Sequence, residues 1–159
     1  MGKRRKNGAQ LAFNILPIDV KATRLAVEDY LEEVRVYRQI GFVRREAAMT
    51  PSYEPRLHGN TNAISKPAED AAVWNVSKEQ ELKRKSELLD MATNRLKSIQ
   101  REIIQRSYMD AEGAFDYISC GEMGLSDSTY RREKNEAIAY LAAALRLQKF
   151  EETQSVEVG

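Results

Sequence analysis

The chain has little of what catalytic and metal sites are usually built from. It contains one cysteine, Cys120, and one histidine, His58, among 159 residues. A single cysteine cannot close an intramolecular disulfide, so we expect a reducing, cytoplasmic environment and a buried, unreactive thiol. A lone histidine in a loop, without a second ligand nearby, does not make a zinc site, so we expect no bound metal.

Other signatures of enzymes and membrane proteins are also missing. The sequence has no phosphate-binding glycine loop, zinc-ligand spacing or serine-elbow motif, so we expect no enzymatic activity and no cofactor. No apolar run approaches the roughly 20 residues that cross a bilayer, and the N-terminus lacks the apolar region of a signal peptide. These features predict a soluble protein with no membrane partner.

Charge is distributed unevenly, although the formal net charge is only +1. Lys3 to Lys6 form a KRRK run, whereas Glu151, Glu152 and Glu157 make the other end acidic. A nearly neutral chain does not favour a DNA binder that is driven by charge alone and is blind to sequence. It leaves room for a modest DNA affinity that is raised by homo-oligomerisation or by a protein partner.

Apolar residues recur at helical spacing through most of the sequence, and no useful strand alternation occurs, so we predict an all-α fold. A stretch with Pro51, Pro55 and Gly59 interrupts this pattern and separates an N-terminal helix from a C-terminal domain. The predicted organisation is a basic flexible arm over 1–18, an amphipathic helical region over 19–48, a Pro/Gly/Asn-rich linker over 49–66, a helical DNA-binding domain over 67–148 with a helix-turn-helix at 114–145, and an acidic flexible tail over 149–159.

Local signals predict where the first helices begin and end. Asp19 is a suitable N-cap, and Gly41 is a plausible stop for the first long helix. Between residues 65 and 94 we expect two helical segments, with Ser77 capping the second and Trp74 anchored in the core. The next helix spans residues 96–109, with Ser98 as its predicted cap.

The region from 114 to 145 has the pattern of a helix-turn-helix. A short apolar helix over residues 114–120 is followed by glycines at 121 and 124, and a long helix begins after the N-cap Ser126. Tyr130 and Ile138 belong to the apolar stripe of this long helix, so we assign them to the core. A polar stripe on another face of the same helix is typical of a helix that enters the major groove of DNA.

This polar stripe supplies the candidate DNA-binding residues. An arginine at 131 or 132 can make a bidentate contact to guanine, and Asn135 can contact a base edge or a phosphate. In the alternative reading, one of the two arginines holds only a phosphate or a neighbouring carboxylate. The candidate base and groove contacts are Ser128, Thr129, Arg131, Arg132 and Asn135, and the candidate phosphate contacts are Arg101, Arg106 and Lys134.

Two resemblances extend this interpretation. Residues 96–145, with REII, SYM, GLSDSTYRREKNEAI and LAAAL, resemble the promoter-reading four-helix domain of sigma factors. Residues 21–147 more closely resemble the ArpU family of phage and prophage transcriptional regulators, through TPSYEP, SKPAEDAAVWNV and LSDSTYRREKNEAI. This resemblance implies regulation of late or lysis- and autolysin-related genes. The turn at 119–123 is one residue longer than in sigma factors, which affects the phase of the short helix.

The leading hypothesis is therefore a sequence-specific transcriptional regulator that binds double-stranded DNA with the helix starting at Ser126. A second hypothesis is a sigma-like adaptor that acts mainly through RNA polymerase. A third is a small phage DNA-packaging subunit that forms a ring. Mobility shifts with and without polymerase separate the first two hypotheses, and a ring-sized oligomer would favour the third.

Overall fold

Helices dominate the part of the chain that the computed structural model describes, which is residues 17–47, 66–110 and 115–151. The prediction of an all-α fold is confirmed, and the described ranges contain no strand beyond an isolated bridge between Ile18 and Phe150. The KRRK run and His58 lie outside the described residues. The elements are α1 (Val20–Ile40), α2 (Lys66–Thr93), α3 (Ser98–Ile104), the π-helical η1 (Gln105–Met109), α4 (Asp116–Glu122) and α5 (Asp127–Ala144).

Helix α1 begins and ends at the residues that the sequence indicates. The Asp19 carboxylate accepts a hydrogen bond from the Ala22 amide at 2.9 Å, which satisfies one of the free donors of the first turn. At the other end, Gly41 has φ of 75°, a left-handed conformation that favours glycine. Between these ends, Val27, Leu31 and Val34 are fully buried along one face.

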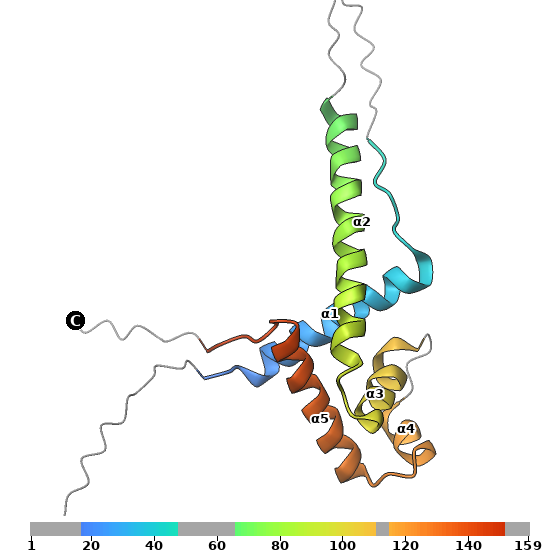
Figure 1. Ribbon diagram of the computed structural model, residues 1–159, viewed down its shortest axis with the longest axis vertical. Coiled ribbons are helices and arrows are strands. Elements are labelled where there is room, and N and C mark those ends of the chain that lie inside the picture. The colour runs from blue at the N-terminus through green and yellow to red at the C-terminus, as the bar shows by residue number, and fades with distance from the viewer. Residues whose placement is uncertain (1–16, 48–65, 111–114, 152–159) are drawn as a thin grey trace, which may run out of the picture.

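This face of α1 packs into the same core as the C-terminal helices. The core joins α1 to residues of α2, α3 and α5, so the N-terminal helix and the predicted DNA-binding domain share one apolar interior. Figure 1 shows the N-terminal part of α1 crossing beside the C-terminal end of α5. An amphipathic helix gains stability by covering its apolar stripe, and α2, η1 and α5 together cover the stripe of α1. The core residues are Val27, Leu31, Val34, Leu89, Ala92, Leu96, Ile104, Ala137, Ile138, Leu141 and Ala142.

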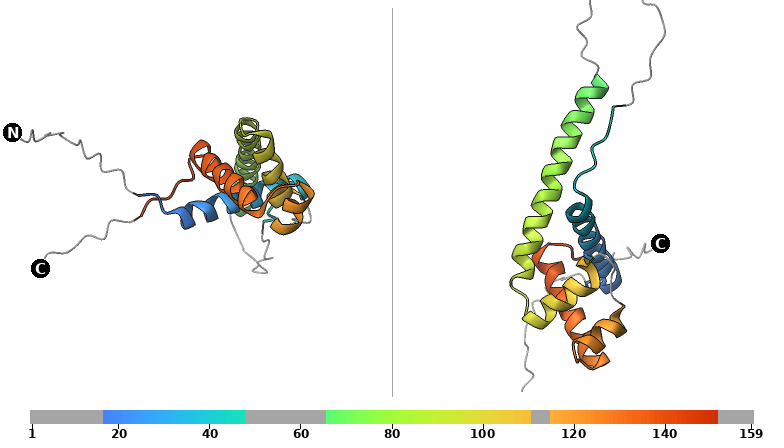
Figure 2. Two further views of the ribbon diagram at one scale, coloured as in Figure 1. Left: turned by 90° about the horizontal axis from the view of Figure 1, so that it is seen from below. Right: turned by 90° about the vertical axis from the view of Figure 1, so that its right-hand side faces the viewer.

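The segments on either side of this bundle are also joined to each other. The Asp19 amide donates to the Lys149 carbonyl at 2.9 Å, and the Glu151 amide donates to the Pro17 carbonyl at 2.8 Å. The Thr23 hydroxyl accepts from the Lys149 amide at 2.9 Å. The start of α1 is therefore fixed beside the segment that follows α5 (Figures 1 and 2).

Helix α2 differs from the two segments that the sequence predicts. It is one continuous helix of 28 residues, with no break at Ser77, and its first half projects beyond the bundle (Figures 1 and 2). Because of this projection, the prediction that Trp74 is a core anchor is wrong, and its side chain is 39% exposed. Trp74 instead contacts Phe42, with ring centroids 6.0 Å apart, and the Arg45 guanidinium, 4.3 Å from the ring centroid.

Tyr108 in η1 predicts how stability depends on alkaline pH. Burial raises the pKa of its phenol, and so does the hydrogen bond that the hydroxyl donates to Glu28 at 2.9 Å. An unfolded tyrosine loses its proton near about pH 10, whereas folded Tyr108 keeps it. The folded state then binds more protons than the unfolded state, so the free energy of unfolding falls as pH rises above that value.

We expect Tyr108→Phe to make this fall shallower, because phenylalanine does not titrate. Urea unfolding between about pH 9 and about pH 11.5 measures the slope. The control is Tyr117→Phe, since the Tyr117 side chain is 73% exposed. An identical slope in the wild-type and Tyr108→Phe proteins would contradict this assignment.

Candidate nucleic-acid interface

Helices α4 and α5 are joined by a tight turn over residues 123–126. Gly124 has φ of 64°, which explains the glycine at this position. The short helix begins at residue 116 rather than at the predicted 114, and its buried side chains are Ser119 and Cys120. The apolar residues ahead of them face solvent, with Phe115 69% and Tyr117 73% exposed. The apolar residues at the start of the short helix are therefore not part of the core. The prediction that Cys120 is buried is confirmed.

The start of α5 is capped as predicted. The Ser126 hydroxyl accepts from the Thr129 amide at 3.3 Å and lies 2.8 Å from the Thr129 hydroxyl. By contrast, the predicted cap Ser98 is the first residue of α3, and the N-cap there is Lys97, whose amide donates to the Gln100 side chain. Ser126 therefore holds the first turn of the candidate reading helix in place.

Replacing Ser126 with alanine is expected to lower the free energy of unfolding by about 1 kcal/mol, because an amide of the first turn loses its partner. Chemical denaturation measures the change. Ser98→Ala is the matched control, since it makes the same substitution at a helix start where the N-cap is a different residue. Equal effects of the two substitutions would show that the Ser126 cap contributes nothing specific.

The buried face of α5 is held by neighbouring elements. Tyr130 is fully buried against Ile103 and Cys120, and its hydroxyl lies 2.8 Å from the Ser107 hydroxyl. Ile138 is also buried, as predicted. The α5 backbone is thus fixed from behind, which leaves its opposite face available to a partner.

Lys134 is located differently from the other candidate residues. The sequence places it among the phosphate contacts, but its side chain is buried, and its ammonium bonds to the Asp116 carboxylate at 2.7 Å. The same ammonium lies 4.8 Å from the centroid of the Tyr108 ring. Position 134 falls one turn beyond Tyr130 on the buried face, so Lys134 ties α5 to α4 and to η1. Its ammonium is thus occupied within the protein and is not among the proposed DNA contacts.

The remaining α5 candidates lie together on the outer face. Ser128, Arg131, Arg132 and Asn135 are exposed, and Thr129 is half-buried. Arg131 pairs with Asp127 at 3.2 Å, and Arg132 reaches Glu133 at 3.5 Å. The Arg131–Asp127 pair is exposed on both sides, and exposed pairs contribute little to stability, so Arg131 can exchange this pair for a phosphate or a base. The Arg132 guanidinium is 65% exposed, whereas its partner Glu133 is buried and also accepts a hydrogen bond from Gln100. Glu133 therefore keeps a partner if Arg132 turns toward DNA.

Two arginines, Arg101 on α3 and Arg106 on η1, make contacts within the protein. Arg101 donates to the carbonyl oxygens of Thr93, Asn94 and Leu96, where α2 ends. Arg106 pairs with the Glu102 and Glu122 carboxylates, which links η1 to the end of α4. Their phosphate contacts stay predictions, and the structure gives both residues a role in holding elements together.

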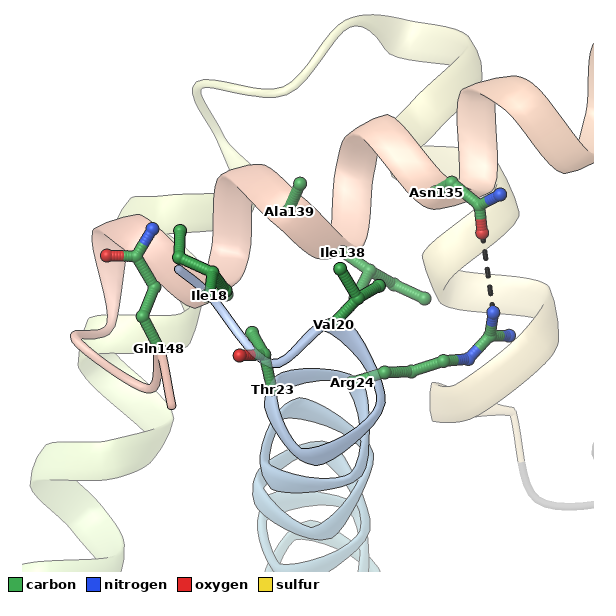
Figure 3. A pocket seen from close by; sticks show the side chains of 9 residues that line it. Ile18, Val20, Thr23, Arg24, Asn135, Ile138, Ala139 and Gln148 are labelled. Atoms are coloured by element: carbon green, nitrogen blue, oxygen red, sulfur yellow. Dashed lines mark hydrogen bonds between the residues drawn. The ribbon is translucent and has the colours of Figure 1, made fainter. Parts of the chain in front are cut away.

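The structure adds residues to this surface that the sequence did not indicate. The Arg24 guanidinium of α1 donates to the Asn135 amide oxygen at 3.3 Å, so α1 reaches the polar face of α5 (Figure 3). Phe115 and Tyr117 stack at a centroid distance of 5.9 Å and share a shallow hollow with Asp127 and Arg131. The sequence could not show the first contact, because the two residues are 111 positions apart.

Together, these observations define a class: an all-α protein in which a capped helix, packed against its neighbours on one side, presents a polar face to solvent. The chain is similar to the uncharacterized phage-related protein Lin1259/Lin1739 of Listeria innocua serovar 6a, with 28% identity over 142 residues, covering 85% of this chain and 94% of that protein. No family model matches the chain, and no solved structure matches it. Among the described helices, none is both long and apolar enough to cross a membrane.

Proposed function

We propose that this protein is a sequence-specific DNA-binding transcriptional regulator that inserts the N-terminal half of α5 into the major groove. The observation that carries the proposal is the contrast between the two faces of α5. One face presents Arg131, Arg132 and Asn135 to solvent, whereas Tyr130 on the other face is fully buried. A helix supported in this way can present side chains to DNA without rearranging.

The chemistry of the exposed face suits base recognition. Arginine makes bidentate contacts to the O6 and N7 atoms of guanine, and asparagine makes them to adenine. Asp127 at the start of α5 would repel phosphates, but a carboxylate can accept a hydrogen bond from the cytosine amino group. The mixture of charges supports a reader of sequence rather than a protein that binds any duplex by charge.

Arg24 extends the surface beyond α5. Its guanidinium contacts Asn135 and is partly exposed, so it can contact a phosphate beside the bases that Asn135 reads. Phosphate contacts of this kind fix the register of a protein on the duplex, while base contacts provide the selectivity. The two helices would then act on the same DNA segment.

The resemblance to ArpU regulators and the similarity to a phage-related protein support a role in a phage or prophage. Within that setting, the proposed targets are late genes or genes for lysis and autolysin. Selecting bound duplexes from a randomised pool, followed by fluorescence anisotropy on the enriched sequence, tests the proposal. Recovery of no common sequence, with equal affinity for every duplex, would overturn it.

A second candidate function is a sigma-like adaptor that acts through RNA polymerase. The stacked pair Phe115 and Tyr117 favours it, because exposed aromatic side chains are enriched where proteins meet. Mobility shifts with and without polymerase separate the two functions. If the protein is an adaptor, a specific mobility shift of the DNA appears only when polymerase is present. A protein carrying both Phe115→Ala and Tyr117→Ala would not produce this shift.

A further inference from the structure

An apolar groove lies between the start of α1 and the second half of α5 (Figure 3). Its volume is about 480 Å³, and Val20, Ile138 and Ala139 form its walls. Arg24 and Asn135 lie together at one end, and Gln148 lies at the other (Figure 3). The groove thus continues directly from the DNA-facing residues along the same helix.

The groove has the features of a small-molecule site. Its volume falls within the range of about 300–1,000 Å³ that is usual for ligand pockets. The residues that line it include one cation, Arg24, and no carboxylate. Val20 remains 75% exposed to water. An apolar ligand that covered this side chain would gain free energy by removing apolar surface from water. The complementary ligand has an apolar body and one negatively charged group.

The contacts of Arg24 show how such a ligand could bind. The Nε atom donates to the Glu28 carboxylate at 3.0 Å, whereas the Nη1 atom makes a longer bond of 3.3 Å to Asn135. A ligand carboxylate can take the outer Nη atoms and leave the bond to Glu28 in place. Because charged partners make stronger hydrogen bonds than neutral amides do, the carboxylate would displace Asn135 from Arg24.

We propose that this groove binds a small amphipathic carboxylate, which draws Arg24 away from Asn135 and weakens DNA binding. The second half of this inference rests on the proposed function. The ligand neutralises a cation beside the DNA-facing residues and adds a negative charge near the phosphates. Coupling between two binding equilibria is reciprocal, so DNA also weakens ligand binding by the same factor.

Binding to the groove can be measured on the full chain without DNA. The probe is sodium octanoate, octanol is its uncharged counterpart, and NMR follows the Ile138 methyl groups and the Asn135 side-chain amide. We expect octanoate to shift both signals at lower concentration than octanol. Arg24→Gln should abolish this preference, and Ala139→Trp should abolish binding by filling the groove. Octanoate that shifts neither signal, or that binds Ala139→Trp as well as the wild type, would overturn the site.

A second experiment measures the coupling to DNA. Octanoate is expected to weaken binding of the selected duplex about fivefold in the wild type, and to leave the affinity of Ala139→Trp unchanged. If no duplex is bound, the proposed function fails while the NMR result still decides the ligand site. If octanoate fills the groove and the DNA affinity is unchanged, the regulation is overturned. A dimer that Ala139→Trp dissociates in sedimentation would overturn the ligand site in favour of a second copy.

Discussion

Replacing Arg132 with alanine is expected to weaken binding of the selected DNA duplex by about 1–3 kcal/mol, or roughly 5- to 150-fold. Arg132 is 65% exposed on the outer face of α5, so the substitution removes the proposed base contact and leaves the buried core unchanged. Fluorescence anisotropy against the selected duplex and against base-pair variants measures both affinity and selectivity.

The pattern of the loss identifies the role of Arg132. If Arg132 contacts a base, Arg132→Ala lowers the affinity for the selected duplex strongly. It then lowers the affinity only slightly for duplexes that carry a different base pair at the contacted position. A phosphate contact predicts an equal loss for all duplexes and a smaller dependence on salt. The control is Arg84→Ala, which removes the same charge from an exposed position on α2. Unchanged affinity and selectivity in the Arg132→Ala protein would remove Arg132 from the interface.

Tyr130→Ala is expected to lower the free energy of unfolding by about 3–5 kcal/mol, because it empties the space of a fully buried aromatic ring. Tyr130→Phe keeps the ring and loses the hydroxyl contacts with Ser107 at 2.8 Å and with the Asp116 carboxylate at 3.5 Å, so we expect a loss of about 1 kcal/mol. Urea unfolding monitored by circular dichroism measures both changes.

The matched control is Tyr140→Ala on the same helix. Tyr140 is 38% exposed, so its truncation removes far less buried surface. Equal losses for the Tyr130→Ala and Tyr140→Ala proteins would show that α5 is not packed against the core as described.

Some features of the fold that depend on neighbouring residues were predictable from the sequence, although the predicted caps at Ser77 and Ser98 were wrong. The caps at Asp19 and Ser126 are confirmed, because a capping side chain bonds to an amide only a few positions away. The burial of Tyr130 and Ile138 follows from helical periodicity, which the sequence shows directly. Local rules therefore determined where α5 starts and which of its faces is buried.

The features that depend on distant residues were not predictable. The burial of Lys134 requires two partners on other elements. The Asp116 carboxylate accepts a hydrogen bond from the Lys134 ammonium, and the Tyr108 ring makes a cation–π contact with it. The exposure of Trp74 follows from the projection of α2, which no local pattern encodes. The contact between Arg24 and Asn135 required α1 to pack on α5. Each of these outcomes was decided by which elements meet in space.

The paired backbones at Pro17–Asp19 and Lys149–Glu151 connect the two ends of the bundle mechanically. Each segment supplies hydrogen-bond partners to the other, so the loss of either segment leaves the other less firmly held. Trimming the chain back to before Gln148 would remove the Lys149 carbonyl and amide that grip Asp19 and Thr23. The first turn of α1 would then fray, and Arg24 would lose its position beside Asn135. A deletion near residue 148 would therefore alter the proposed DNA-binding face of α5.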